Sequence, residues 1–173
     1  MEYLNESVFR PAGMTNTFAD DPLKIISNRS APYDTIRTGQ IGNSVFVNTS
    51  YKIPGGGLIS TAQDMAKFMI ALQEGKLLNQ TTWKQMITEV KTTKGVPTHY
   101  GFGWILGIPP FEGLPTLPSA IWHGGVQQGS TTAILMLPDR DIAVVVLSNL
   151  GELGTEITAT TAWIAYFLSA AKQ

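Results

Sequence analysis

Apolar residues recur at helical spacing most clearly in the middle of the chain. One face of this segment is apolar, at Ala62, Met65, Phe68, Met69 and Leu72. Thr61 comes directly before the pattern and Asp64 follows three residues later, which is the spacing of a helix cap. Gly75 ends the pattern. The sequence therefore predicts a helix from about Thr61 to Glu74.

Two shorter helices are predicted on either side of this one. Residues 2–9 have helical spacing, which Pro11 and Gly13 break. A further helix is expected to start at residue 81 or 82 and to run to about Val90. Residues 16–54 show no sustained period, so we expect a long irregular excursion with short strands there.

The C-terminal third alternates apolar runs with turn residues. Four runs have the length and composition of strands, namely YGFGWILG, AIWHG, TTAILMLP and DIAVVVLSN. Residues 138–141 predict a tight turn between the last two, and residues 119–149 are expected to form an antiparallel meander. From Trp163 the tail is apolar on nearly every face, so residues 157–172 predict a terminal helix packed on the sheet.

These elements predict an α+β fold, an antiparallel sheet meander flanked by helices. No internal repeat or linker divides the sequence, so residues 1–173 are interpreted as one domain. Within it, residues 1–98 form the helical and loop part, and residues 99–173 form the sheet and the C-terminal helix.

Charge and composition narrow the possible partners. The formal net charge of −1 provides no basic surface for nucleic acid or acidic lipid, so a small-molecule or peptide substrate is expected. No run has signal-peptide character or reaches the roughly 18 apolar residues of a membrane span, so no membrane contact is expected. Cysteine is absent and neither His99 nor His123 stands in a ligand cluster, so neither a metal nor a cofactor is predicted.

His123 is the main candidate for chemistry. It follows an apolar run and precedes Gly124 and Gly125. A histidine that closes a buried strand is ordinarily a core residue with one hydrogen bond, whereas a histidine at a cleft can bind a ligand or move a proton. Composition and spacing leave both interpretations open.

Four stretches, in the same order, resemble the beta-lactamase-related serine hydrolases, which include class C beta-lactamases, penicillin-binding proteins, D-aminopeptidases and esterases. VFRPAGMTNT resembles the Pro-Leu-Gly-Met segment that ends a helix in this family, with Ala12 in place of the leucine. GGGLISTAQDMAKFMIAL resembles its Gly-Gly-Leu-x-Ser-Thr-x-x-Asp helix start, and YGFGW resembles its Tyr-Gly-x-Gly-Trp strand. HGGVQQGSTT resembles its His-x-Gly third motif. Together these stretches cover nearly the whole chain.

The resemblance implies a role for the segment that begins at His123. His123 would be a catalytic residue on an edge strand that lines the substrate cleft. Gly124, Gly125 and Val126 would bind the substrate, because Gly125 leaves room for it to approach the strand. A backbone N–H near Gly125 or Val126 would contribute to an oxyanion hole.

The resemblance also suggests two further substrate-binding residues, each with a simpler interpretation. Tyr51 would lie in a loop that faces the substrate, although a loop tyrosine is ordinarily structural. Trp104 would form a cleft wall, although a strand tryptophan is ordinarily part of the core. Ser60 and Thr61 are interpreted as a helix cap rather than as nucleophiles.

The family needs a Ser-x-x-Lys nucleophile at a helix start and a Tyr-x-Asn or Tyr-x-Ser motif, because lysine and tyrosine activate the serine. Ser169 and Lys172 match the first pattern, but in the last turn of the terminal helix. Tyr3 and Asn5 match the second pattern, but inside the helix that precedes Pro11. Both matches are interpreted as chance. The resemblance thus implies the C-terminal half of such a hydrolase, a partial domain expected to be inactive alone.

We therefore predict the C-terminal portion of a serine hydrolase that acts on amide or ester bonds. The alternative is a non-catalytic binding or assembly module that retains the fold. Strand 141–149 and the terminal helix would expose apolar surface, so we expect a dimer, by self-association or with the missing N-terminal half. The resemblance suggests a bacterial protein, extracytoplasmic or cytoplasmic, and the compartment stays open.

Overall fold

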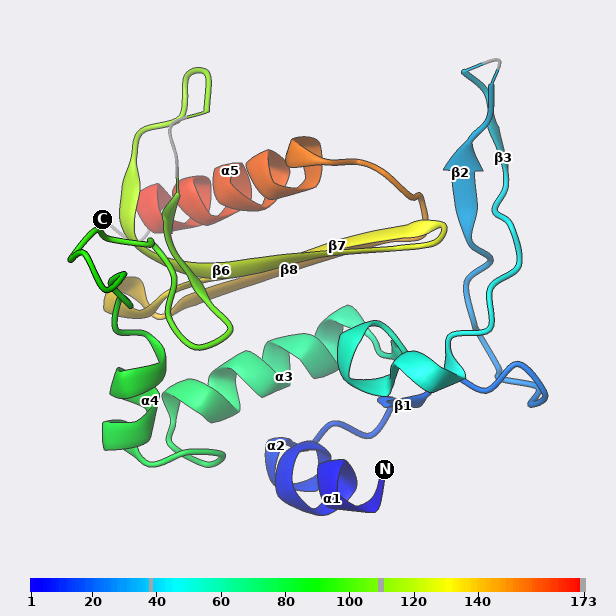
Figure 1. Cartoon of the computed structure of the whole chain (residues 1–173), viewed down its shortest axis with the longest axis horizontal. Coiled ribbons are helices and arrows are strands. Elements are labelled where there is room, and N and C mark those ends of the chain that lie inside the picture. Colours follow the sequence, from blue (N-terminus) through cyan, green and yellow to red (C-terminus); the bar gives the residue numbers. More distant parts are fainter. Residues whose placement is uncertain (38, 109–110, 172–173) are drawn as a thin grey trace.

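The computed structural model describes residues 1–37, 39–108 and 111–171, and its centre is a four-stranded antiparallel sheet between helices (Figure 1). The strands lie in chain order, β5 (Ile105–Ile108), β6 (Leu117–Gln127), β7 (Ser130–Leu137) and β8 (Ile142–Ser148). Helix α5 (Thr155–Ala171) packs on one face of this sheet. Helices α3 (Ala62–Gln73) and α4 (Gln80–Met86) cover the other face. The α+β meander that the sequence predicts over residues 119–149 is confirmed.

Alternation along the strands divides the core into two layers. In β7, Leu135 and Leu137 belong to the layer beneath α5, while Met136 belongs to the layer beneath α3. Met136 is fully buried with Met69 of α3. Because side chains alternate between the two faces of a strand, this division fixes the faces of β6, to which β7 pairs.

Several predicted element boundaries are confirmed. Thr61 caps α3, where its hydroxyl accepts a hydrogen bond from the Asp64 N–H at 3.1 Å. The tight turn between β7 and β8 is a 3-10 turn over Pro138–Arg140, and Asp141 has a φ of 49°. The terminal helix forms as predicted, whereas Lys172 lies outside the described residues.

The second predicted helix is shorter than expected. It begins at Gln80, one residue before the prediction, because the Asn79 side chain accepts from the Thr82 N–H at 2.8 Å. It ends at Met86 rather than near Val90. The Met86 carbonyl oxygen accepts from the Phe102 N–H instead of a later helical N–H. The predicted extension to Val90 is therefore wrong, and the following segment turns back toward β5.

The N-terminal helix continues through Pro11. It comprises α1 (Glu2–Leu4), a π turn over Asn5–Phe9 and α2 (Arg10–Ala12). Gly13 ends it with a φ of 71°, in the left-handed region that glycine adopts readily. The break predicted at Pro11 is wrong and the break at Gly13 is confirmed.

The expected irregular excursion after this helix contains only short elements. Strand β1 (Phe18–Ala19) pairs with β4 (Leu58–Ile59), and β2 (Tyr33–Thr35) pairs with β3 (Ile41–Asn43). A 3-10 segment covers Ser50–Gly55. Figure 1 shows β2 and β3 beside the end of the central sheet where β6 turns into β7.

A buried carboxylate joins the N-terminal segment to α3. Asp64 is fully buried, and its Oδ2 accepts hydrogen bonds from the Asn16 N–H at 2.6 Å and the Thr17 hydroxyl at 2.9 Å. The Lys67 ammonium lies 3.2 Å from Oδ1 and also donates to the Gly13 carbonyl oxygen. Burial raises the pKa of the Asp64 carboxyl, but these hydrogen bonds and the Lys67 charge outweigh it and leave the pKa below its usual value.

The described residues hold neither a membrane-spanning helix nor a group of metal ligands. None of their helices is long and apolar enough to cross a bilayer. Within the same residues, no three histidine or carboxylate side chains gather as a metal site would require.

We predict that Asp64→Asn lowers the free energy of unfolding by about 2–4 kcal/mol at neutral pH, because it leaves buried donors without their anion. A depressed folded pKa stabilises the protein above the ordinary carboxylate pKa of about 3.9, and this contribution is lost as the pH falls through the folded value. The deficit of the variant should therefore shrink in acid. Urea unfolding at several pH values measures it.

The exposed Asp139 offers the matched control. Asp139→Asn removes a carboxylate of the same kind from the surface and should change stability by less than about 0.5 kcal/mol. Equal effects of the two substitutions would contradict a special role for Asp64.

Candidate functional site

The structure places His123 on the α3 face of the sheet and near the end of β6. Its neighbour Trp122 packs in the layer beneath α5, so the alternation of β6 turns the His123 side chain toward the opposite face. His123 is half-buried. The ring is thus not sealed in the core.

Both ring nitrogens of His123 have polar partners. Nδ1 lies 2.6 Å from the carbonyl oxygen of Gly124, and Nε2 lies 2.7 Å from the hydroxyl oxygen of Tyr100. The Tyr100 and His123 rings meet edge to face, with centroids 6.1 Å apart. This arrangement differs from that of a core histidine with one hydrogen bond. The ring has two polar contacts, and one of them is to a tyrosine that is itself partly exposed.

One edge of β6 loses its strand partner where this site begins. β5 pairs with β6 between Leu117 and Trp122, and its first residue, Ile105, lies opposite Trp122. From His123 to Gln127, β6 pairs only with β7 within the described sheet. Gly125 and Val126 are exposed there, and Val126 retains 65% of its accessible surface. The structure therefore brings the predicted residues 123–126 together on one partly open strand.

Tyr100 is the residue that the sequence analysis missed as a site candidate. It opens the YGFGW stretch, whose two glycines shape the turn that carries it. A Cβ at Gly101 would lie 2.1 Å from the Met86 carbonyl oxygen, so only glycine fits against the end of α4. The Gly101 N–H donates to the Trp104 carbonyl oxygen at 2.8 Å, which closes the turn. The available signal was the position of Tyr100 within this motif.

Trp104 is a core residue, which corrects its assignment as a cleft wall. Its side chain is 4% exposed and meets Trp83 of α4 edge to face, with centroids 5.8 Å apart. The strand begins after it, at Ile105. Burial on the inner side of α4 removes the Trp104 ring from any surface that a ligand could reach.

Tyr51 lies on the 3-10 segment near the far end of β6. Its side chain is 74% exposed. The next residue, Lys52, donates to the Gln127 side-chain oxygen at 3.3 Å, so this segment packs beside the last residue of β6. No contact between Tyr51 and His123 is among the described interactions, and a ligand role for Tyr51 stays a prediction.

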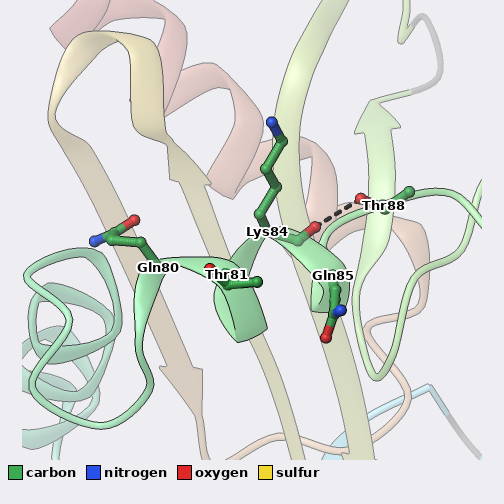
Figure 2. Close-up of a pocket in the computed structure, with 5 residues that line it drawn as sticks. All are labelled: Gln80, Thr81, Lys84, Gln85 and Thr88. Atoms are coloured by element: carbon green, nitrogen blue, oxygen red, sulfur yellow. Dashed lines mark hydrogen bonds between the residues drawn. The ribbon is translucent and has the colours of Figure 1, made fainter.

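Two hollows lie near the ends of the sheet, and His123 lines neither of them. The larger, about 420 Å³, lies along the outer side of α4 and is lined by Gln80, Thr81, Lys84, Gln85 and Thr88 (Figure 2). All five side chains come from one helix and the residues that follow it, and Lys84 extends away from the others. A smaller one, about 240 Å³, is lined by Asp34, Val126, Gln127, Gln128 and Glu152 at the β6 end. The second therefore adjoins the open segment of β6.

The two chance matches to nucleophile motifs lie in structural positions. Ser169 is buried in α5, and its hydroxyl donates to the Tyr166 carbonyl oxygen at 2.8 Å. Lys172, its partner in the pattern, lies outside the described residues. Tyr3 is exposed on the N-terminal helix. Neither match lies at the first turn of a buried helix.

A family model described as Beta-lactamase matches residues 1–166 of this chain. Among curated proteins, penicillin-binding protein 4* of Bacillus subtilis (strain 168) is 24% identical over 165 residues, which cover 86% of this chain and 34% of that protein. The chain thus spans about a third of the length of this protein and of a second penicillin-binding relative from the same organism.

Solved structures share the fold. A penicillin-binding protein from Bacillus halodurans superposes with a TM-score of 0.71 and 23% identity, over 94% of this chain and 49% of that one. A D-amino acid amidase from Ochrobactrum anthropi SV3 in complex with L-phenylalanine gives 0.71 and 21%, over 99% and 50%. At these identities the likeness concerns the fold, and it extends over about half of each neighbour.

We predict that Gly101→Ala lowers the free energy of unfolding by about 1–3 kcal/mol, because the new methyl group overlaps a backbone oxygen that cannot move freely. Gly55→Ala is the matched control, since no atom lies within 4 Å of the added methyl and the φ of Gly55 is outside the left-handed region. Thermal or urea unfolding of the two variants provides the comparison. A neutral Gly101→Ala would contradict the tight packing described for this turn.

Proposed function

The chain belongs to the beta-lactamase family of serine hydrolases, and we propose that it forms the substrate-binding side of an active site that cleaves amide or ester bonds. The whole-protein activity is a proposal, since the chain spans about a third of its curated relatives. The name of the D-amino acid amidase among the structural neighbours supports an amide substrate.

The observation that carries this proposal is the open segment of β6 from His123 to Gln127. Along an unpaired strand edge, every second residue directs its N–H and C=O away from the sheet. A substrate with an amide or ester group can pair with such an edge. An N–H placed beside its carbonyl oxygen would stabilise the negative charge that develops there during attack. Gly125 keeps the α3 face of this edge free of a side chain.

Acylation needs a serine with an adjacent base, and the one Ser-x-x-Lys match in the sequence does not provide it. The Ser169 hydroxyl is buried and already donates within α5. This observation favours the second candidate for the chain on its own, a binding or assembly module that retains the fold. In a larger assembly the nucleophile would have to come from outside residues 1–173.

We predict that the isolated chain forms no acyl-enzyme. Intact-mass spectrometry after incubation with a fluorophosphonate or a penicillin should show the unmodified mass. A stoichiometric adduct that Ser169→Ala abolishes would overturn both this expectation and the assignment of Ser169 as a structural residue.

We also propose that β8 mediates association with another chain. It is the last strand of the described four-stranded sheet and has only β7 as a partner there. Its outer edge runs along an apolar strand, and on α5 the side chains of Ile164, Phe167 and Leu168 are exposed. An unpaired apolar edge is a template for pairing, and about 800 Å² per partner is the usual scale for a stable contact.

Sedimentation equilibrium at micromolar concentration tests this association, with self-association as the expected result. Leu147→Lys places a charge on β8 and should shift the population toward monomer. Val96→Lys introduces the same charge at an exposed valine outside β8 and α5. It should leave the proportion of monomer unchanged. A monomeric wild-type chain that unfolds cooperatively would overturn the proposal.

A further inference from the structure

The Tyr100 phenol and the His123 imidazole form a hydrogen-bonded pair whose proton positions follow from their partners. A carbonyl oxygen only accepts hydrogen bonds, so the 2.6 Å contact with the Gly124 oxygen requires a proton on Nδ1. In the neutral ring, Nε2 is then the acceptor, and the Tyr100 hydroxyl at 2.7 Å donates to it. The geometry thus determines both the tautomer and the direction of the hydrogen bond.

We propose that Tyr100 is a positioning residue that holds His123 as the Nδ1–H tautomer and itself presents the polar atom of the pair to a ligand. Within the described contacts, both ring nitrogens are already engaged. The Tyr100 oxygen retains lone pairs, and the side chain is 37% exposed. While His123 is neutral, the pair accepts a hydrogen bond from a ligand but donates none.

This polarity defines the class of ligand group that fits beside His123. A group that carries hydrogen, such as an amine or a hydroxyl, can donate to the Tyr100 oxygen. A carboxylate has no hydrogen to donate and meets only lone pairs there. The ligand part of this inference rests on the proposed function of β6, whereas the tautomer and its cause do not.

The fold holds Tyr100 in place before any ligand arrives. The Val90 N–H donates to the Tyr100 carbonyl oxygen at 2.8 Å, and the Leu106 N–H donates to the His99 carbonyl oxygen at 2.9 Å. Gly101 packs against the end of α4 directly after Tyr100. Backbone contacts on both sides therefore fix the main chain from which the phenol reaches His123, as expected of a positioning residue.

Nitrogen NMR of histidine-labelled protein tests the tautomer at an alkaline pH, where imidazoles are neutral. The chain has two histidines, and His99→Asn assigns the remaining signals to His123; asparagine tolerates the φ of 54° at residue 99. We expect a protonated Nδ1 and an unprotonated, hydrogen-bonded Nε2. In Tyr100→Phe, which keeps the ring, the Nε2 resonance should move toward the position of a nitrogen without a donor.

Tyr3→Phe removes an exposed hydroxyl on the N-terminal helix, with no described contact to His123, and should leave both resonances unchanged. A protonated Nε2 in the wild-type chain would overturn the proposal without any variant. An unchanged Nε2 resonance in Tyr100→Phe would also overturn it.

Two probes then separate the ligand part from the tautomer. Phenylalaninamide carries donors beside its ring, and 3-phenylpropionate carries only a carboxylate. We expect phenylalaninamide alone to shift the His123 resonances, and Tyr100→Phe to abolish that shift. A response to phenylpropionate alone would overturn the prediction that the pair accepts a hydrogen bond from the ligand and donates none. A response to neither probe would overturn the proposed substrate edge while the tautomer stands.

Discussion

The buried carboxylate of Asp64 is the interaction on which the placement of the N-terminal helix against α3 depends. It lies in the first turn of α3, where the helix dipole favours a negative charge, and it gathers a backbone N–H and a hydroxyl from residues 16 and 17. Lys67, one turn later, adds a charge and also reaches the Gly13 carbonyl oxygen. One side chain thereby fixes where the N-terminal helix ends relative to the helix that covers the sheet. A buried carboxylate without these partners would cost free energy of folding. Arrangements of the two helices that break these contacts are therefore disfavoured.

The position of α3 in turn determines which face of β6 stays open. α3 and α4 cover the middle of the sheet through Met69, Leu72 and Trp83, and this cover includes Ile121 but ends before Gly125. His123 lies at this boundary, so its ring is half-buried against Tyr100 rather than enclosed. Trp104 is buried in the same apolar cluster as these residues. Its burial beside Trp83 anchors the turn that carries Tyr100, and a tryptophan assigned to the cleft thus serves the site from the core.

Local sequence patterns predicted the helices and strands better than the contacts between them. The stripe on α3 and its Thr61 cap are encoded within a few residues, and so is the turn between β7 and β8. The partners of Asp64 lie 47 and 48 residues away, and Tyr100 lies 23 residues from His123, so no local pattern reports these contacts. The end of α4 was misjudged for the same reason, because the Met86 carbonyl oxygen pairs with a residue beyond the following loop. Burial of Trp104 required knowledge of which helix packs over it.

The open edge of β6 has a local cause in β5. Gly107 has a φ of 75° and marks a shift of register between Leu106 and Ile108, so β5 bends at its middle. The Trp122 indole N–H donates to the Gly107 carbonyl oxygen at 2.9 Å, which locks this bend. Because β5 begins only at Ile105, opposite Trp122, its pairing with β6 stops one residue before His123. A β5 that extended before Ile105 would have run beside His123 and the glycines that follow it and closed the edge. The turn that carries Tyr100, closed by the Gly101 N–H on the Trp104 carbonyl oxygen, directly precedes Ile105 and leaves this edge without a partner in β5.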